Sequence, residues 1–502
     1  MDLTNVTSFL VEEKRMLING EWVQASTGKT FAVFNPANGE KIADVPDGNS
    51  DDVDKAVFAA SAALQDVSWK RLPPSERTNL LWRLADLLVE HESFLVELEV
   101  LNQGKQKELA THLDVHGSAE TLRYYAGWCT KIEGVSLDIS FPDFREPQSQ
   151  GIPYHAYSRK EPIGVVAAIV PWNVPLVMAI AKLAPALTAG CAVVLKPAQE
   201  TPLTTLVLGE LIQQAGFPPG VVNIITGFGP EVPSAMAKHM DIDMVAYTGS
   251  TVVGKLITQA AAESNLKRVA LELGGNRPVI ICEDCDIDAA VAGTIDGLFV
   301  ISAQMCFAGS RVFVEETVYD EFKAKIIEQV GKLKLGSGND ESSDITPVIS
   351  VNQRDRIVNM VNQAVNDGAG LLLGGNAVEK QGFYVEPTVL ECVDSSIATV
   401  REEIFGPVMS LTKFRSSSEI NTVAQFANDT DYGLTASIWT KDVSKAHQIA
   451  AEIKAGMIWV NCAFAFDEGL PFGGYKQSGW GREGSFAGVE EYLQSKSVIV
   501  AL

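Results

Sequence analysis

Residues 163–195 read I-G-V-V-A-A-I-V-P-W-N-V-P-L-V-M-A-I-A-K-L-A-P-A-L-T-A-G-C-A-V-V-L and form the most apolar stretch of the chain. The stretch opens with the uninterrupted apolar run Gly164–Val170 and closes with Cys191–Leu195. Such runs are typical of strands that a parallel sheet buries on both faces. Leu176–Leu187, between them, favours a helix. Three prolines and a lysine interrupt the stretch, so we interpret it as strand, turn, helix and strand and not as a membrane span.

The same alternation continues on the C-terminal side of this stretch. The expected elements are a helix over 202–215, strands over 221–225 and 244–247, a helix over 251–264 and a strand over 268–273. Repeated strand–helix units predict a doubly wound α/β sheet, and ligands of such sheets bind at the carboxyl ends of the strands.

A second α/β region is expected from Gly274 onward. Strands are predicted over 278–282, 437–440 and 457–461, and helices over 286–300, 318–334 and 351–366. On the N-terminal side, residues 17–45 favour short strands with Asn-Gly turns, and helices are expected over 51–64, 74–98 and 122–128.

Residues 140–159 differ from their surroundings because they contain three prolines and show little helical periodicity. They predict either a linker or a hairpin arm. In the second case, Tyr154–Tyr157 could pair as an edge strand in an oligomer contact. The apolar, β-branched end of the chain, 496–502, is also expected to form a paired strand.

The composition limits the class of protein. The chain has 502 residues, of which 46% are hydrophobic and 21% charged, as expected for a globular protein of two or three domains. The net charge of −23 argues against nucleic acid or an anionic membrane as the main partner.

The first fifteen residues lack the apolar core of a secretory signal. Seven dispersed cysteines favour reduced thiols and a cytoplasmic location. Cys282 and Cys285 form a C-x-x-C pair, which we interpret as two thiols near a strand end in preference to a metal or redox site.

One cysteine lies in a stretch that suggests a catalytic nucleophile. Residues 299–311 read F-V-I-S-A-Q-M-C-F-A-G-S-R, with Cys306 followed by small residues that let a substrate approach the backbone. Glu272, in L-E-L-G-G, is the candidate partner. A thiolate can attack an electrophilic carbon, and a carboxylate can then activate the water that releases the product. A cysteine among apolar residues is more often a small buried hydrophobe, so this reading depends on the rest of the chain.

Other candidate binding residues follow predicted strands. Gly227 and Gly229 follow one strand, and Gly249-Ser250 opens a helix, where free N–H groups can bind phosphate. Neither site matches the full G-x-G-x-x-G pattern, so plain turn glycines are an equal alternative. Lys196 at a strand end could bind ribose hydroxyls or be solvated, and Asn173 could donate to an oxyanion or be a turn residue.

Seven blocks of sequence, in order, resemble the aldehyde dehydrogenase superfamily over nearly the whole chain. They are E-P-I-G-V-V-A-A-I-V-P-W-N-V-P, L-K-P-A-Q-E-T-P, Y-T-G-S-T-V-V-G, L-E-L-G-G, Q-M-C, E-E-I-F-G-P-V and P-F-G-G-Y-K-Q-S-G. The phenylacetaldehyde dehydrogenases resemble the chain most in character. The resemblance implies an α/β fold of two doubly wound domains with a small β oligomerisation arm. It places a dinucleotide-binding domain at 1–139 and 163–273, a catalytic domain at 274–484 and the arm at 140–162 and 485–502. It also implies a homotetramer or homodimer.

The resemblance also implies roles for individual residues. Cys306 would be the nucleophile, Glu272 the general base, Asn173 an oxyanion donor and Lys182 a residue near the proton path. NAD would be held by a set of nine residues: Lys196, Gln199, Gly229, Gly249, Ser250, Trp172, Leu273, Glu403 and Phe405. No metal is implied. Gly274 and Gly275 could let the base shift between steps, in which case Gly275→Ala would slow deacylation more than hydride transfer.

Four departures from the family pattern bear on function. Gln199 stands where a glutamate often accepts from the adenosine ribose, so we expect NAD use with tolerance of NADP. Ile301 and Ala303 replace an Asn and a Gly before the nucleophile and predict a stiffer, drier loop. Asn276-Arg277 replaces a common Lys-Ser or Lys-Asn. Val174 replaces a frequent Phe, which predicts a wider aldehyde tunnel.

The tunnel residues implied by the resemblance are apolar: Val174, Met178, Met305, Phe307, Phe464, Phe466 and Phe472. They favour an aromatic or medium-chain apolar aldehyde, although a phenylalanine cluster is also a common core feature and would leave a broad aliphatic range. Asp467 and Glu468 could instead favour a cationic aminoaldehyde.

Three rival functions remain to be weighed. Transfer of the acyl group to coenzyme A is disfavoured because relatives with that activity tend to lack the general base, and Glu272 is present. A thiol hydrolase is disfavoured because no histidine lies in a motif near Cys306. A non-catalytic structural protein on the same fold is disfavoured by the retained site residues, and a lack of cofactor binding would revive it.

Overall fold

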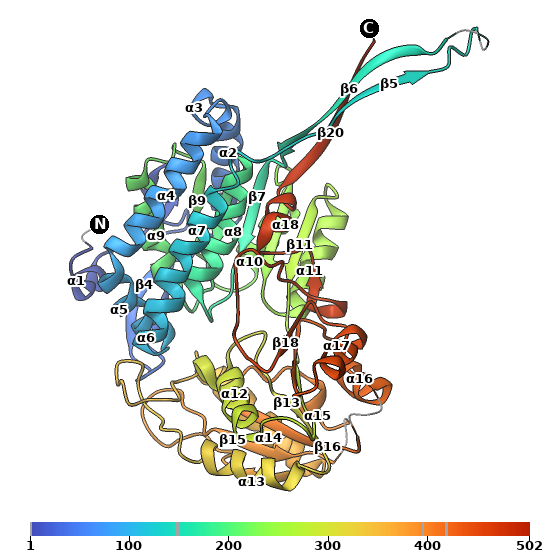
Figure 1. The fold of residues 1–502 in the computed structure, drawn as a ribbon. Coiled ribbons are helices and arrows are strands. Elements are labelled where there is room, and N and C mark those ends of the chain that lie inside the picture. Colours follow the sequence, from blue (N-terminus) through green and yellow to red (C-terminus); the bar gives the residue numbers. More distant parts are fainter. Residues whose placement is uncertain (1–2, 147, 149, 394–395, 417–419, 502) are drawn as a thin grey trace.

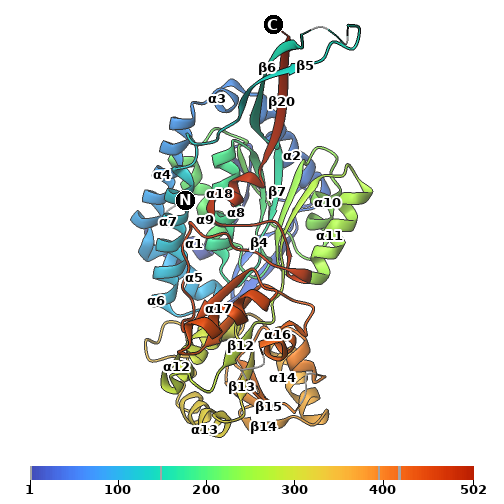
Figure 2. The same cartoon turned by 45° about the vertical axis from the view of Figure 1, so that its right-hand side comes forward.

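The computed structural model of the chain describes residues 3–146, 148, 150–393, 396–416 and 420–501. In this part, the strands form two large sheets, a three-stranded arm and a small hairpin, as Figures 1 and 2 show. The two large sheets occupy opposite halves of the body, and the arm projects from the half that contains the N-terminal helices (Figure 1). The fold is therefore of the α/β class, with two large sheets and a small β arm, as the sequence predicts.

The first sheet has the strand order β19-β11-β10-β7-β8-β9-β1-β2. Its parallel centre consists of β11 (Arg268–Glu272), β10 (Met244–Thr248), β7 (Val165–Ile169), β8 (Ala192–Lys196) and β9 (Val222–Ile224). Antiparallel strands flank it: β1 (Met16–Ile18), β2 (Glu21–Val23) and β19 (Gly479–Trp480). Because the central strands are parallel, their carboxyl ends share one edge of the sheet.

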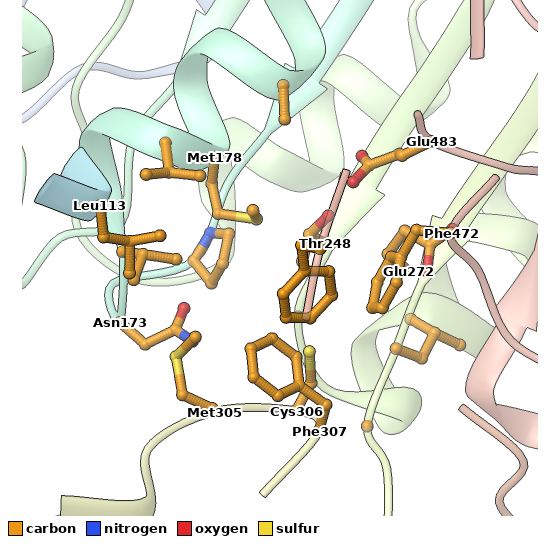
Figure 3. A pocket seen from close by; sticks show the side chains of 18 of the residues that line it. Leu113, Asn173, Met178, Thr248, Glu272, Met305, Cys306, Phe307, Phe472 and Glu483 are labelled. Carbon is orange, nitrogen blue, oxygen red and sulfur yellow. The ribbon is translucent and has the colours of Figure 1, made fainter. Parts of the chain in front are cut away.

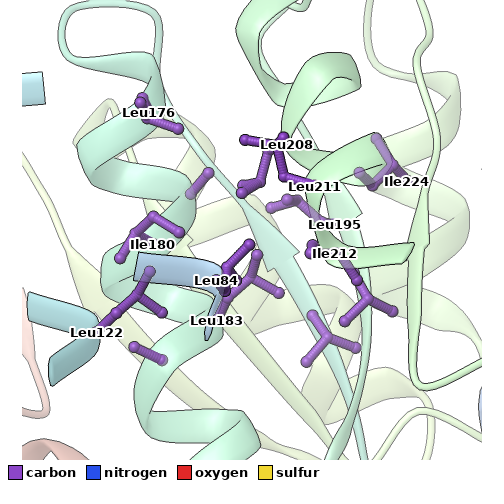
Figure 4. Packing of buried hydrophobic residues seen from close by; sticks show 14 of the residues in the cluster. Leu84, Leu122, Leu176, Ile180, Leu183, Leu195, Leu208, Leu211, Ile212 and Ile224 are labelled. Atoms are coloured by element: carbon purple, nitrogen blue, oxygen red, sulfur yellow. The ribbon is translucent and has the colours of Figure 1, made fainter. Parts of the chain in front are cut away.

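Both faces of this sheet are buried, which explains the apolar runs in its strands. Val166 and Ala168 of β7 face one core and Val165 and Ala167 face the other. The first core contains α4 (Pro74–Glu90), α7 (Ser118–Ala126), α8 (Pro175–Ala189) and α9 (Leu203–Ala215), and Figure 4 shows leucines of these helices against β8. The second contains α2 (Ser50–Gln65), α10 (Glu231–Lys238) and α11 (Thr251–Glu263).

The second sheet has the order β14-β15-β16-β13-β12-β17-β18 and is parallel apart from β14. Its strands are β14 (Gly370–Leu373), β15 (Thr388–Glu391), β16 (Val408–Phe414), β13 (Arg311–Glu315), β12 (Pro278–Ile281), β17 (Thr435–Trp439) and β18 (Met457–Val460). In the described part, six helices accompany it: α12 (Ile287–Phe299), α13 (Tyr319–Val330), α14 (Val351–Asn366), α15 (Ala398–Arg401), α16 (Ile420–Asn428) and α17 (Val443–Glu452). The strand β19 lies beyond these elements in sequence but pairs with β11 of the first sheet, so the chain crosses back between the two halves.

The arm is a hairpin and not a linker. The strands β5 (Ser136–Phe141) and β6 (Ile152–Pro162) pair with each other, and β20 (Leu493–Ala501) pairs with the other side of β6. The expectation that Tyr154–Tyr157 form an edge strand is therefore wrong, because these residues have a neighbouring strand on both sides. The free edges of the arm belong to β5 and β20. Leu502 of the expected terminal strand and residues 147 and 149 of the expected arm lie outside the described part.

One predicted helix is divided in two. The periodic pattern over 74–98 belongs to α4 and to α5 (Glu92–Gln103), separated at His91, where φ is −99° and ψ is 20°. Both helices bury their apolar side chains in the same core, so the hydrophobic period continues across the break and does not reveal it. The division into domains inferred from the family resemblance stays a prediction.

Candidate active site

A cavity of about 510 Å³ lies where the carboxyl ends of the first sheet face the second half of the molecule. Cys306 and Glu272 both line it, although they are 34 positions apart in the sequence. Figure 3 shows Cys306, Glu272, Asn173 and Met305 around the same space. The structure therefore brings the predicted nucleophile, base and oxyanion donor to one cavity.

Glu272 is the last residue of β11 and is almost completely buried. Burial raises the pKa of its carboxyl group well above the usual value, and the nearby carboxylate of Glu483 raises it further, while Lys182 and Arg482 lower it. Its Oε2 atom has no hydrogen-bond partner among the described residues. A raised pKa favours the protonated carboxyl group, and only the deprotonated form can act as a base.

Lys182 is close enough to this carboxyl group to lower its pKa, but it does not line the cavity. It is buried on α8, and its Nζ donates a hydrogen bond to Oε1 of Glu483, which does line the cavity. This ion pair places an ammonium group and a carboxylate group near Glu272. Sequence reasoning missed Glu483, although it follows the glycine-rich segment Gly479–Gly481.

The loop that carries Cys306 is held in a strained backbone conformation. Ile301, Ser302 and Ala303 have φ values of 49°, 54° and 59°, in the left-handed region that a β-branched residue such as isoleucine rarely adopts. The Oγ atom of Ser302 accepts a hydrogen bond from the N–H of Thr346 at 3.1 Å, and Oε1 of Gln304 accepts from the N–H of Ile349 at 2.9 Å. All these loop side chains are buried, so surrounding contacts fix the conformation of the segment that precedes Cys306.

Cys306 is partly exposed to the cavity. Its apolar surroundings raise the pKa of the thiol strongly, and the carboxyl groups of Glu403, Glu272 and Glu483 raise it further, in that order. The thiol is therefore mostly protonated in the free protein at neutral pH. A positive charge brought into the cavity would favour the thiolate.

Asn173 follows β7 and precedes α8, so it lies at a carboxyl end of the first sheet. Its Nδ2 atom donates to the carbonyl of Gln304 at 2.9 Å and lies 3.6 Å from Sδ of Met305. The amide thus braces the nucleophile loop. The N–H directed at the methionine sulfur makes the weaker contact and is the one that can transfer to an oxyanion.

The predicted cofactor residues fall into two groups. Those that line the cavity with Cys306 are Trp172, Gly249, Ser250, Leu273, Glu403 and Phe405. The rings of Trp172 and Phe405 meet edge to face with centroids 5.3 Å apart. Lys196, Gln199 and Gly229 do not line this cavity and lie at or near the ends of β8 and β9.

Several observations fit a dinucleotide at this edge of the sheet. Lys196 is buried, and burial lowers its pKa to about 8, so a polyhydroxyl partner would compensate for its lost hydration. A methyl group on Gly249 would lie 2.2 Å from Oη of Tyr247, so a larger residue at this turn would require that ring to move. Oε1 of Gln199 accepts from the N–H of Gly229 at 2.8 Å, which connects the two residues outside the cavity. Burial raises the pKa of Glu403 to about 7, and its Oε1 accepts from the N–H of Gly275 at 2.9 Å.

Most of the predicted substrate residues line the cavity, namely Val174, Met178, Met305, Phe307, Phe466 and Phe472. Phe464 does not. Its ring packs against Phe307 with centroids 5.1 Å apart, so it supports the wall from behind. Other lining side chains were not foreseen: Leu113, Thr121, Tyr125, Val177, Thr248, Gln353, Arg356, Met457 and Leu470. Leu113 belongs to a π-helix (Ala110–Gly117), which sequence periodicity does not identify.

Gly274 and Gly275 allow a close approach of chain segments. A methyl group on Gly274 would lie 2.4 Å from Oε2 of Glu403, and one on Gly275 would lie 2.1 Å from the carbonyl oxygen of Cys306. A methyl group at Gly275 would therefore press on the nucleophile itself, which favours slowing of both steps, and the selective effect of Gly275→Ala on deacylation stays a prediction.

In the described part of the chain, no helix is both long and apolar enough to cross a lipid bilayer. All seven cysteines lie in the described ranges, and none of them is in a disulfide there. No group of three or more His, Cys, Asp or Glu side chains is placed to hold a metal ion in the ranges that the structure describes.

Comparisons with known proteins identify the family of the chain. Residues 22–498 match the sequence model of the aldehyde dehydrogenase family. The chain is 45% identical to human retinaldehyde dehydrogenase 3 over 98% of this chain and 94% of that protein, and 43% identical to chicken (Gallus gallus) retinal dehydrogenase 2 over 98% and 92%. The NAD⁺ complex of aldehyde dehydrogenase from Bacillus cereus superposes with a TM-score of 0.93 at 42% identity, over 99% of this chain and 98% of that one. The chain belongs to the aldehyde dehydrogenase family.

Proposed function

We propose that this protein uses NAD to oxidise an aromatic or medium-chain apolar aldehyde to the carboxylic acid. The observation that carries the proposal is the single cavity that holds Cys306 and Glu272 between apolar walls. Phe307, Phe466 and Phe472 supply aromatic surface, and Val174 leaves room where a larger side chain would narrow the space. A pocket of this composition binds an apolar ligand by burying it.

Cys306, Asn173 and Glu272 can each carry out one part of this reaction. The thiolate of Cys306 adds to the aldehyde carbon, and Nδ2 of Asn173 with the Cys306 N–H donates to the oxyanion. When bound, NAD supplies the hydride acceptor and a positive charge near the thiol. Loss of hydride leaves a thioester on Cys306. Glu272, in its carboxylate form, takes a proton from the water that hydrolyses this thioester.

The cofactor preference follows from Gln199. An amide repels a 2′-phosphate less than a carboxylate does, so NADP should be tolerated. The neighbouring carboxylate of Glu200, whose Oε1 accepts from Nε2 of Gln199 at 3.2 Å, keeps some negative charge close to this position and favours NAD.

The arm supports a homo-oligomer, as a dimer or a tetramer. Its free-edge strands expose large apolar side chains, among them Leu137 at 54%, Phe141 at 53% and Ile499 at 60% exposure. A projecting arm with exposed apolar residues gains stability by docking on another subunit. Light scattering after gel filtration would give the subunit number, and a monomer would contradict the proposal. The seven cysteines, none of which is in a disulfide in the described part, also fit a cytoplasmic location.

A second substrate class is favoured by one feature. Glu468 lines the cavity, is part-buried and accepts a hydrogen bond from Oγ1 of Thr121 at 2.6 Å, so a cationic aldehyde could bind there. The deciding experiment follows reduced nicotinamide with phenylacetaldehyde, hexanal and betaine aldehyde, each with NAD and with NADP. A higher kcat/KM for phenylacetaldehyde supports the aromatic wall. Preference for hexanal supports a broad aliphatic range, and preference for betaine aldehyde supports Glu468.

A further inference from the structure

Arg277 is a cation buried directly behind the nucleophile loop. It lies between Gly275 and β12, the residue is 1% exposed, and no carboxyl group of the described residues forms an ion pair with it. Burial lowers the pKa of its guanidinium to about 9, so it stays protonated at neutral pH. A buried cation without a carboxylate partner is costly to the fold, so its retention at this place needs a compensating use.

The guanidinium contacts the backbone of the nucleophile loop. Its Nη1 donates to the carbonyl oxygen of Phe307, the residue after Cys306, at 3.0 Å. A hydrogen bond from a charged donor is about twice as strong as a neutral one. This bond fixes the peptide group between residues 307 and 308, one residue beyond the reacting thiol.

Two glycines form the slot in which the guanidinium sits. A methyl group on Gly297 of α12 would lie 2.5 Å from its Nη2, and a methyl group on Gly309 would lie 3.2 Å from its Nε. The slot leaves the arginine side chain little freedom, so the position of Phe307 is set by a rigid donor.

The same guanidinium also supports the aromatic wall. It lies 4.9 Å from the ring centre of Trp459, a distance typical of cation–π contacts. Trp459 donates through Nε1 to the carbonyl of Ala465 at 2.9 Å and packs edge to face on Phe307 and Phe466. One side chain thus contacts both the loop of the nucleophile and the support of the substrate wall.

We infer that Arg277 is a positioning residue that holds Cys306 through the Phe307 carbonyl and holds the aromatic wall through Trp459. The inference rests on the proposed function for its substrate readout, but its effect on the thiol can be measured without any aldehyde. Misplacement of a reacting group by about 1 Å costs about 100-fold in rate, so loss of the guanidinium is expected to be visible in both readouts.

The test compares Arg277→Met and Arg277→Lys with Arg311→Met and Arg311→Lys in the full-length protein. Arg311 is an equally buried guanidinium with a pKa lowered to about 9, and it donates to the carbonyls of Asn276 and Ala427 at 2.9 and 3.0 Å. It therefore controls for the loss of a buried arginine. The readouts are Tm, the rate of Cys306 alkylation by iodoacetamide against pH, and the ratio of kcat/KM for phenylacetaldehyde to that for hexanal.

We expect both methionine variants to lose Tm, but only Arg277→Met to lose roughly 10-fold or more in alkylation rate and to lower the aromatic-to-aliphatic ratio. Arg277→Lys should recover part of the alkylation rate because an ammonium can still donate to Phe307. If Arg277→Met does not fold, Gly297→Ala is the second variant. Its added methyl group shifts the guanidinium but leaves the positive charge in place, and it should lower the alkylation rate with Tm retained.

The inference would be overturned if folded Arg277→Met kept the wild-type rate of Cys306 alkylation at each pH and the wild-type ratio of kcat/KM for the two aldehydes. If Arg277→Met does not fold, the same result in Gly297→Ala would overturn it. Equal losses in the Arg311 variants would also overturn it. Wild-type protein that is alkylated at Cys306 but oxidises neither aldehyde would refute the proposed substrate and leave the alkylation comparison to decide on Arg277.

Discussion

Gly275→Ala is the substitution whose consequence follows most directly from the structure. The new methyl group would lie 2.1 Å from the carbonyl oxygen of Cys306 and 3.3 Å from Cβ of Leu434. Nonbonded carbon and oxygen atoms need about 3 Å or more, so the two segments must separate by roughly 1 Å. Gly275 cannot move freely, because its N–H donates to Glu403 at 2.9 Å. The displacement therefore falls in large part on Cys306.

A shift of this size at a reacting atom costs about 100-fold in rate, or about 2.7 kcal/mol in barrier height. Acylation and deacylation both take place on Cys306, so both should slow by a similar factor. Stopped-flow measurement of reduced nicotinamide gives the first-turnover rate, and the steady state gives the later steps. Gly370→Ala is the control, because a methyl group there would meet Cβ of Glu391 at an ordinary 3.6 Å.

The reasoning would be refuted by a variant that keeps the wild-type first-turnover rate and loses only steady-state turnover. That result would mean that Gly275 acts as a hinge for the base and not as a spacer for the nucleophile. A loss of similar size in Gly370→Ala would mean that the assay reports general destabilisation.

Three further predictions concern charge in the site. Glu403→Gln should lower the pKa of the Cys306 thiol, since this carboxyl group raises it, and iodoacetamide should then alkylate Cys306 faster at pH 7.5; an unchanged rate would contradict the assignment. Lys182→Met should leave the first turnover intact and move the pH profile of steady-state turnover upward, because Lys182 lowers the pKa of Glu272; a profile that stays in place would separate the lysine from the base. Gln199→Glu should raise the ratio of NAD to NADP activity through repulsion of the 2′-phosphate, measured as kcat/KM for each cofactor, and a ratio that does not rise would show that Gln199 is not near that group.

Much of the fold could be predicted because local pattern and tertiary burial agree. The alternate residues of β7 enter two different cores, so an uninterrupted apolar run was the correct signal for a strand covered on both faces. The break at His91 could not be predicted, because α4 and α5 bury their side chains in one core. The edge-strand expectation for Tyr154–Tyr157 failed because it depends on a partner, β20, more than 300 residues away in sequence.

The site was predictable in its residues and less so in its geometry. Cys306 and Glu272 could be identified from their sequence context, but their shared cavity depends on how the second half of the chain meets the first sheet. Phe464 and Phe466 are two residues apart, yet only Phe466 lines the cavity, since the direction of each side chain is set by the loop. Arg277 stood out only as an unusual residue, because its slot is built by glycines from other segments.

The central claim is that Cys306 carries the acyl group and Glu272 releases it. The most direct measurement mixes the Glu272→Gln variant with phenylacetaldehyde and NAD and locates any added mass by peptide mass spectrometry. The predicted result is one equivalent of reduced nicotinamide per active site and a phenylacetyl group on the peptide that contains Cys306. Full turnover by this variant, or an acyl group on a different residue, would contradict the account.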